Sequence, residues 1–179
     1  MSSDLTKNYF DLFGLNVTFD LDLDDLESRF RKLQKEFHPD RFVSVSEQER
    51  RIAMQLTAHI NEAYQTLIKP LSRGGYMLKL NDINVNDESD TKMDASFLME
   101  QMELREQLDE MKNKNDQEDK IQELTLTIKS GQEKRIDELQ ECFKSITDDS
   151  LSHARNLIRE MQFFEKMATQ LEELDDEFL

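Results

Sequence analysis

The chain has 179 residues with only two prolines and four glycines. Helix-favouring Leu, Glu, Lys, Gln and Met are common and alternating β-branched residues are nearly absent, so the composition predicts an all-α fold. The formal net charge is −16, and an acidic chain is repelled by phosphate backbones and anionic lipid surfaces. Nucleic acid and membranes are therefore poor candidates as partners.

The charge is unevenly spread along the chain. Residues 1–75 contain 10 Lys and Arg against 12 Asp and Glu, whereas residues 76–179 contain 13 against 27. These two regimes indicate a domain over residues 1–75, a linker with a short helical turn over 76–93, and a second domain over 94–179.

The cysteine content and the length of the apolar runs limit the classes of protein to which the chain can belong. Cys142 is the only cysteine, which excludes an internal disulfide or a cysteine-based zinc site within one chain. The first residues lack an apolar or Arg-rich leader, and no apolar run reaches the ~20 residues needed to span a bilayer. We expect a cytoplasmic monomer without a resident metal or cofactor.

Three helices are predicted in the first domain. A brief aromatic-rich helix at Tyr9–Phe13 can end at Gly14 in the left-handed conformation. Asp22 can cap a second, amphipathic helix that extends to Phe37. The capping-box pattern that begins at Ser46 predicts a third helix, which Pro70 stops.

The loop between the two long helices contains His38-Pro39-Asp40. Pro39 fixes its own φ, removes a backbone donor and keeps His38 out of the α region, so this loop is stiff. Four cations precede it: Arg29, Arg31, Lys32 and Lys35. Taken alone, they can simply complement the helix dipole. Beside this loop they indicate a docking surface for an acidic partner, to which Asp40 adds an anion.

The second domain shows three long helical patterns, at about 95–112, 117–146 and 150–174, each with one apolar stripe. One stripe per helix predicts a three-helix bundle. Gly131 lies inside the middle pattern and costs about 1 kcal/mol relative to alanine, which predicts a bend or a weak point there.

The first bundle helix has more apolar residues than its core stripe needs. Relative to the core residue Phe97, Leu98, Met102 and Met99 lie roughly 100°, 140° and 200° around the helix. Phe163 similarly lies opposite the stripe of the last helix. An apolar patch within a charged rim is typical of a protein-binding face. Alternatively, Leu98 and Met99 pack against the first domain or the linker, and Phe163 packs against another helix.

Four segments in register resemble a DnaJ-type J domain: Asn8 to Leu15, Phe30 to Leu33, Phe37 to Arg41 and Ile60 to Leu67. The resemblance implies that the loop and the basic helix face dock on a DnaK-type ATPase and stimulate ATP hydrolysis. The implied chaperone-binding residues are Arg31, Lys32, Lys35, His38, Pro39, Asp40 and Arg41. Glu36, where many J domains have lysine, and Glu27 on the basic face depart from the pattern and favour a specialised chaperone.

The segment from Phe97 to Glu106 resembles the signature of the HscB family, J-type co-chaperones of iron-sulfur cluster assembly. With it the likeness spans nearly the whole chain, although residues 113–134 match only in helical character. It implies that the second domain binds the scaffold protein IscU and delivers it to the specialised chaperone HscA. The implied scaffold-binding residues are Leu98, Met99, Met102, Glu103, Arg105, Glu106 and Phe163.

Two other functions compete with this interpretation. A general J protein would deliver unfolded clients, but the chain lacks a Gly/Phe-rich linker and cysteine repeats. An enzyme would use His38 and Asp40 as acid and base, or His59 and His153 as metal ligands, but we find no nucleophile, phosphate loop or ligand spacing. We therefore expect no catalytic residues, and we interpret Cys142 as a small packing residue.

Overall fold

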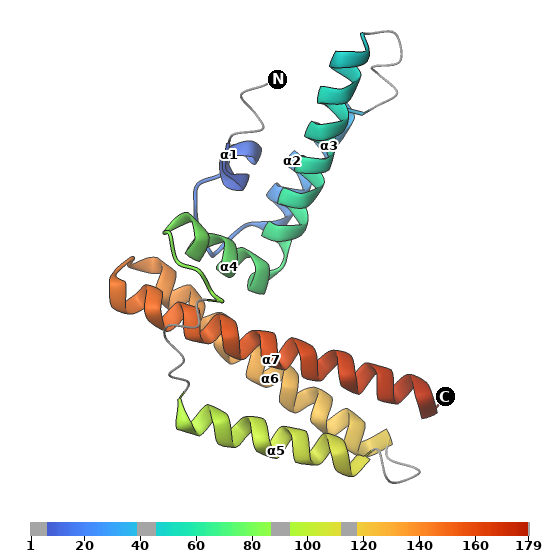
Figure 1. The fold of residues 1–179 in the computed structure, drawn as a ribbon, viewed down its shortest axis with the longest axis vertical. Coiled ribbons are helices and arrows are strands. Elements are labelled where there is room, and N and C mark those ends of the chain that lie inside the picture. Colours follow the sequence, from blue (N-terminus) through green and yellow to red (C-terminus); the bar gives the residue numbers. More distant parts are fainter. Residues whose placement is uncertain (1–6, 39–45, 87–93, 112–117, 179) are drawn as a thin grey trace. The chain divides into compact units, whose positions relative to one another are not determined.

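A computed structural model describes residues 7–38, 46–86, 94–111 and 118–178. These residues form seven α-helices and no strand, which confirms the all-α prediction (Figure 1). The chain divides into two compact units, Met1–Met77 and Leu78–Leu179. Within the described part of the chain, no helix is both long enough and apolar enough to cross a membrane.

The first unit begins with α1 (Tyr9–Phe13), which ends at Gly14 as the sequence predicts and is also capped at its start by Asn8. The Asn8 side chain accepts a hydrogen bond from the backbone N–H of Asp11 at 2.9 Å. Gly14 follows the helix with φ of 65°, in the left-handed region that glycine adopts without strain. The rings of Phe10 and Phe13 are buried, so this short helix is held mainly by its apolar face.

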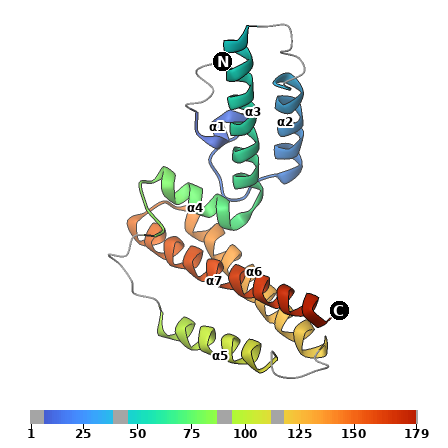
Figure 2. The same ribbon diagram turned by 45° about the vertical axis from the view of Figure 1, so that its right-hand side comes forward.

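Helices α2 (Leu23–Glu36) and α3 (Glu47–Ile68) form a hairpin, and Figure 2 shows them side by side. Asp22 caps α2 through two backbone N–H groups, and Ser46 and Glu49 form the predicted capping box of α3. The Phe30 and Tyr64 rings stack between the helices with centroids 3.9 Å apart. The fully buried residues of this hairpin are Leu26, Ala53, Leu56, Ile60, Ala63 and Leu67.

Helix α4 (Pro70–Leu80) is longer than the short turn expected after Pro70. Proline stops α3 because it cannot donate to that helix, but at a first helical position its missing N–H costs nothing. Arg73 joins the two helices, since its guanidinium donates to the carbonyl of Leu67 at 2.6 Å and lies 5.0 Å from the centre of the Phe19 ring.

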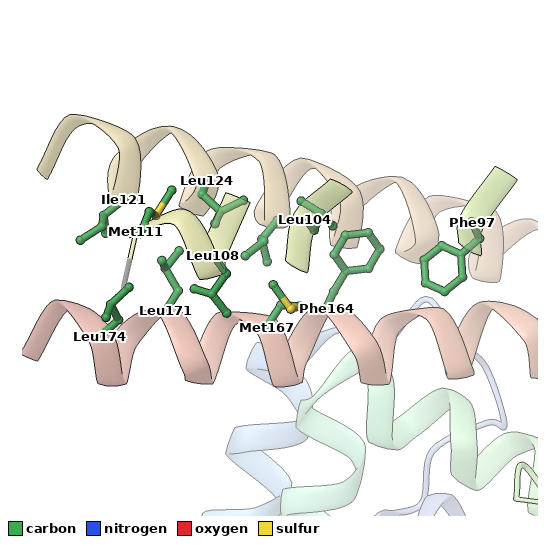
Figure 3. Packing of buried hydrophobic residues seen from close by; sticks show 11 residues of the cluster. Phe97, Leu104, Leu108, Met111, Ile121, Leu124, Phe164, Met167, Leu171 and Leu174 are labelled. Atoms are coloured by element: carbon green, nitrogen blue, oxygen red, sulfur yellow. The ribbon is translucent and has the colours of Figure 1, made fainter. Parts of the chain in front are cut away.

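The second unit contains α5 (Ala95–Met111), α6 (Glu118–Lys144) and α7 (Asp148–Phe178), close to the three predicted patterns. Helices α6 and α7 run side by side along their length, and α5 lies along them (Figures 1 and 2). Helix α6 continues through Gly131 without interruption. The core between the three helices is shown in Figure 3, and its buried residues are Phe97, Leu104, Leu108, Met111, Ile121, Leu124, Ile128, Phe164, Met167, Leu171 and Leu174.

Candidate protein-binding sites

The structure fixes the point at which the loop after α2 begins. Phe37 closes the helix by donating its backbone N–H to the carbonyl of Leu33 at 3.0 Å. Its own carbonyl accepts a hydrogen bond from the Thr57 hydroxyl of α3 at 2.9 Å. His38 follows directly and is exposed. The hairpin therefore presents His38 from a defined position. Pro39, Asp40 and Arg41 lie outside the described residues.

The predicted basic face is present on the outer side of α2. Arg31, Lys32 and Lys35 are all exposed. Arg31 forms an i,i+4 ion pair with Glu27, but 70% of the Arg31 side chain remains accessible. An exposed pair of this kind is worth little, so Arg31 can exchange Glu27 for a carboxylate on a partner at small cost.

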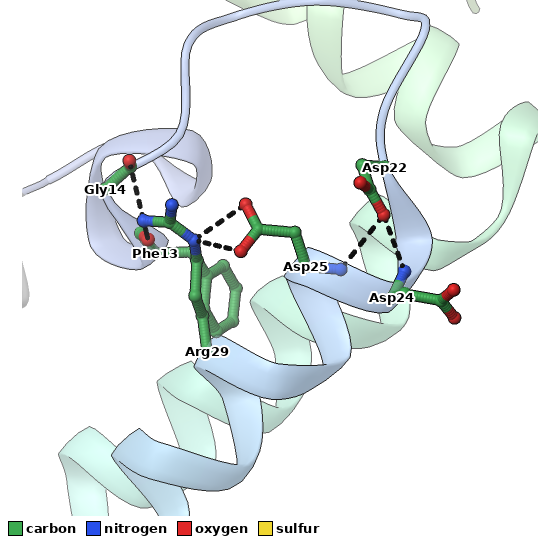
Figure 4. Close-up of polar contacts among 6 residues, drawn as sticks. All are labelled: Phe13, Gly14, Asp22, Asp24, Asp25 and Arg29. Carbon is green, nitrogen blue, oxygen red and sulfur yellow. Dashed lines mark hydrogen bonds and ion pairs between the residues drawn. The ribbon is translucent and has the colours of Figure 1, made fainter.

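Arg29 precedes this face in the sequence but has a structural role. Its guanidinium donates to the carbonyls of Phe13 and Gly14, both at 3.0 Å, and its Nε contacts both oxygens of Asp25 at 2.9 Å (Figure 4). Arg29 thus holds the end of α1 against the first half of α2. The sequence places it in the same basic run as Arg31, and only the structure separates the two roles.

The apolar surplus on α5 is exposed, as its helical spacing predicts. The exposed fractions of Leu98, Met99 and Met102 are 45%, 64% and 72%. Charged Glu103, Arg105 and Glu106 are also exposed on the same helix. We call these six residues the α5 patch. Within the second unit, therefore, the other helices do not bury Leu98, Met99 or Met102.

Phe163 is less exposed than its spacing on α7 suggested. Its ring is half-buried and meets the Phe97 ring edge-to-face with centroids 5.8 Å apart. Phe163 therefore packs against another helix, as the alternative predicted, because α5 lies against α7 at this level. Its role in scaffold binding stays a prediction. The Arg105 guanidinium lies 5.5 Å from the centre of the Phe163 ring, which links this ring to the α5 patch.

The remaining candidates for chemistry are scattered. His59 lies edge-on to the Tyr9 ring in the first unit, whereas His153 of the second unit is exposed, with its Nε2 3.6 Å from Glu138. Cys142 is buried, and burial raises the pKa of its thiol, which disfavours the thiolate that metals bind. Among the described residues no group of three His, Cys, Asp or Glu is placed to hold a metal ion.

Comparisons with known proteins agree on one family. A family model described as the HSCB C-terminal oligomerisation domain matches residues 93–172. The chain is 38% identical over 169 residues to the co-chaperone protein HscB homolog of Shewanella woodyi. The alignment covers 94% of this chain and 97% of that relative.

Two solved structures extend the agreement to three dimensions. Chaperone HscB from Vibrio cholerae matches with a TM-score of 0.82 at 39% identity, covering 97% of this chain and 100% of that one. Human co-chaperone protein HscB matches with a TM-score of 0.83 at 31% identity, covering 93% of this chain and 81% of that one.

A J-type helical hairpin joined to a three-helix bundle is the architecture of a J-domain co-chaperone. The chain belongs to the HscB family, the J-domain co-chaperones of iron-sulfur cluster assembly. This confirms the resemblance seen in the sequence. The roles of individual residues, the monomeric state and the cellular compartment stay predictions.

Proposed function

We propose that the chain is an adaptor without chemistry of its own. Its first unit stimulates the ATPase of a specialised DnaK-type chaperone of the HscA kind. Its second unit binds the scaffold protein, IscU, and delivers it to that chaperone for cluster maturation or transfer. Hydrolysis would take place in the chaperone, so this role requires no nucleophile or metal on the adaptor.

The observation that carries the proposal is the exposed α5 patch. Leaving apolar side chains in water forgoes roughly 1.5 to 3 kcal/mol each relative to full burial. Leu98, Met99 and Met102 are exposed together within two turns of one helix. The core side of α5 is filled by other residues, so the bundle leaves these three exposed, and a bound scaffold would bury them. Methionine adapts to an irregular surface, and the charged rim supplies orientation.

The basic face of α2 supports the other half of the proposal. Three cations, Arg31, Lys32 and Lys35, stand on one exposed helix of a chain whose net charge is −16. Charge of the opposite sign on the chaperone would speed the encounter and orient it. His38 emerges at the end of the same helix, where the docked chaperone would contact it.

Binding of the purified, cluster-free scaffold, measured by calorimetry, tests the patch. The double variant Leu98→Ala with Met102→Ala should lose affinity by about tenfold or more, because residues at the centre of an interface carry most of its energy. Leu126→Ala is a matched control, since Leu126 is 61% exposed on α6 but lies outside the patch. Equal affinity of the double variant and the control would refute the scaffold role, and selective capture of unfolded clients would favour a general J protein.

Association with the ATP-loaded chaperone tests the basic face. Arg31→Ala with Lys35→Ala should slow association and reduce its dependence on salt. Lys129→Ala with Lys134→Ala removes the same charge from exposed positions of the second unit and serves as the control. If both double variants associate at the wild-type rate, the basic face of α2 is not the docking surface.

A further inference from the structure

In the described part of the second unit, a buried cation is explained neither by the apolar core nor by the proposed sites. Arg135 lies on the core side of α6 and is 8% exposed. Its Nη2 donates to Oε2 of Glu100 on α5 at 2.6 Å, and its Nε donates to Oε2 of Glu160 on α7 at 2.9 Å. A single guanidinium thus joins all three helices of the bundle.

The same guanidinium is packed between aromatic rings. It lies 5.4 Å from the centre of the Phe97 ring and 4.8 Å from the centre of the Phe164 ring. Phe97 in turn meets Phe163, over which Arg105 lies. Continuous packing therefore runs from the buried Arg135 to Arg105 on the surface of α5.

Ion pairs made by a buried cation need not add net stability. Their desolvation cost can equal their Coulomb energy, and well-packed apolar residues often replace them without loss. Burial lowers the pKa of Arg135, but the hydrogen bonds and the negative charges of Glu100 and Glu160 together outweigh burial and raise it, so the cation is retained. Burial raises the pKa of Glu160, so its ionised form is held at a cost.

The directional hydrogen bonds of Arg135 restrict the position of α5 in a way that the contacts of its apolar stripe do not. Apolar contacts are non-directional, whereas the guanidinium must keep Nη2 within hydrogen-bond reach of Glu100 and Nε within reach of Glu160. Glu100 lies between Met99 and Met102, so the bonded carboxylate belongs to the turn of α5 that exposes the patch. Fixing Glu100 therefore fixes the position and rotation of the patch.

We infer that Arg135, through its bonds to Glu100 and Glu160, is a positioning residue that sets the register of α5 and so preorganises the α5 patch for its partner. This inference rests on the proposed scaffold role. Arg135 itself is too buried to contact the scaffold, so its effect passes through Glu100 and the aromatic rings. Preorganisation improves affinity because binding no longer bears the cost of ordering the surface.

The variants Glu100→Gln and Glu100→Ala test this inference most cleanly. They cut the bond to α5 but leave Arg135 paired with Glu160, so no buried charge loses all its partners. Gln keeps one acceptor oxygen and Ala keeps none, so the effects should follow that order. Glu110→Gln is the control, because Glu110 is an exposed carboxylate on the same helix and lies beyond the patch.

Two measurements are made on each full-length variant. Calorimetry gives the affinity for the cluster-free scaffold, which should fall about tenfold for Glu100→Ala, less for Glu100→Gln and not at all for the control. Spin labels on cysteines introduced at Gln107 of α5 and Lys129 of α6, in a Cys142→Ala background, give the distance distribution between the two helices. It should broaden or shift in Glu100→Ala and return towards wild type in Glu100→Gln.

Three outcomes would overturn the inference. Glu100→Ala could bind the scaffold as tightly as Glu110→Gln. Affinity could fall while the distance distribution stays narrow, which would mean that Glu100 contacts the scaffold directly. The bundle of Glu100→Ala could unfold, which would make the bond a source of stability. Unchanged binding by the Leu98→Ala with Met102→Ala variant would instead refute the scaffold role, and the label distances would still test the register.

Discussion

A methyl group added at Gly131 of α6 would lie 2.7 Å from two ring carbons of Phe164 on α7. Phe164 is fully buried and packs in the bundle core. Glycine therefore occupies this mid-helix position because any side chain would collide with the ring. The close approach of α6 to Phe164 depends on it.

The variant Gly131→Ala should destabilise the second unit by up to about 2 kcal/mol. Alanine gains about 1 kcal/mol of helix propensity, but overpacking a core typically costs about 1 to 3 kcal/mol, and the Phe164 ring is fully buried. Gly75→Ala in α4 is the matched control, since a methyl there meets nothing within 4 Å. Urea unfolding should show the control slightly stabilised. A stabilised Gly131→Ala would mean that the ring moves freely.

Alanine substitution of Arg29 should lower the stability of the first unit much more than alanine substitution of Arg31. Arg29→Ala should lower the stability of the first unit by about 1 to 2 kcal/mol, because two carbonyls and Asp25 lose a partly exposed charged donor. Arg31→Ala should change stability by less than about 0.5 kcal/mol, since its pair with Glu27 is exposed. Chemical unfolding and chaperone association, measured on both variants, check this separation. Equal loss of stability would contradict it.

Alkaline pH should weaken the first unit through Tyr9. Burial, together with the neighbouring Glu62 carboxylate, raises the pKa of Tyr9 to about 12. The folded state therefore keeps a proton that the unfolded chain releases near its ordinary pKa of about 10. The stability contributed by Tyr9 is fully present below that value and is lost as pH rises towards 12.

The variant Tyr9→Phe isolates this contribution because its ring can keep the stack on Tyr76, whose centroid is 4.3 Å away. Urea midpoints measured between about pH 9 and about pH 11.5 should fall less steeply for the variant than for wild type. A residual slope is expected, since burial also raises the pKa of Tyr76. Identical slopes in the two proteins would show that Tyr9 titrates normally.

The variant Phe163→Ala should destabilise the bundle by roughly 2 to 3 kcal/mol, because truncation removes a half-buried ring from Phe97 and leaves part of a cavity. Thermal unfolding measures this loss. Weak scaffold binding by Phe163→Ala would therefore reflect lost folding as well as a lost contact. Weak binding by Leu98→Ala with Met102→Ala would reflect the lost contact alone. Unchanged stability would show that the ring faces solvent instead.

Local features of this fold could be predicted from the sequence because they depend on residues close together in the chain. Helix caps form with backbone groups within a few residues, so the residue types at these positions predict the helix ends, as they do at Asp22, Ser46 and Gly14. The exposure of Met99 and Met102 likewise follows from helical periodicity alone.

Features that depend on contacts between distant elements could not be predicted. The burial of Phe163 depends on where α5 meets α7, and the partners of Arg135 are 35 and 25 residues away. One signal was available, because Arg135 occupies the core face of α6, seven residues after Ile128 and four before Leu139. A cation on an apolar stripe indicates a buried partner without identifying it.

The chaperone's steady-state ATP hydrolysis, measured with and without the scaffold, tests the central claim most directly. Wild-type adaptor should stimulate hydrolysis alone and should stimulate it further with scaffold present. His38→Gln should abolish both effects without changing thermal unfolding, whereas Leu98→Ala with Met102→Ala should lose only the additional stimulation. Wild-type stimulation by a folded His38→Gln variant would contradict the account.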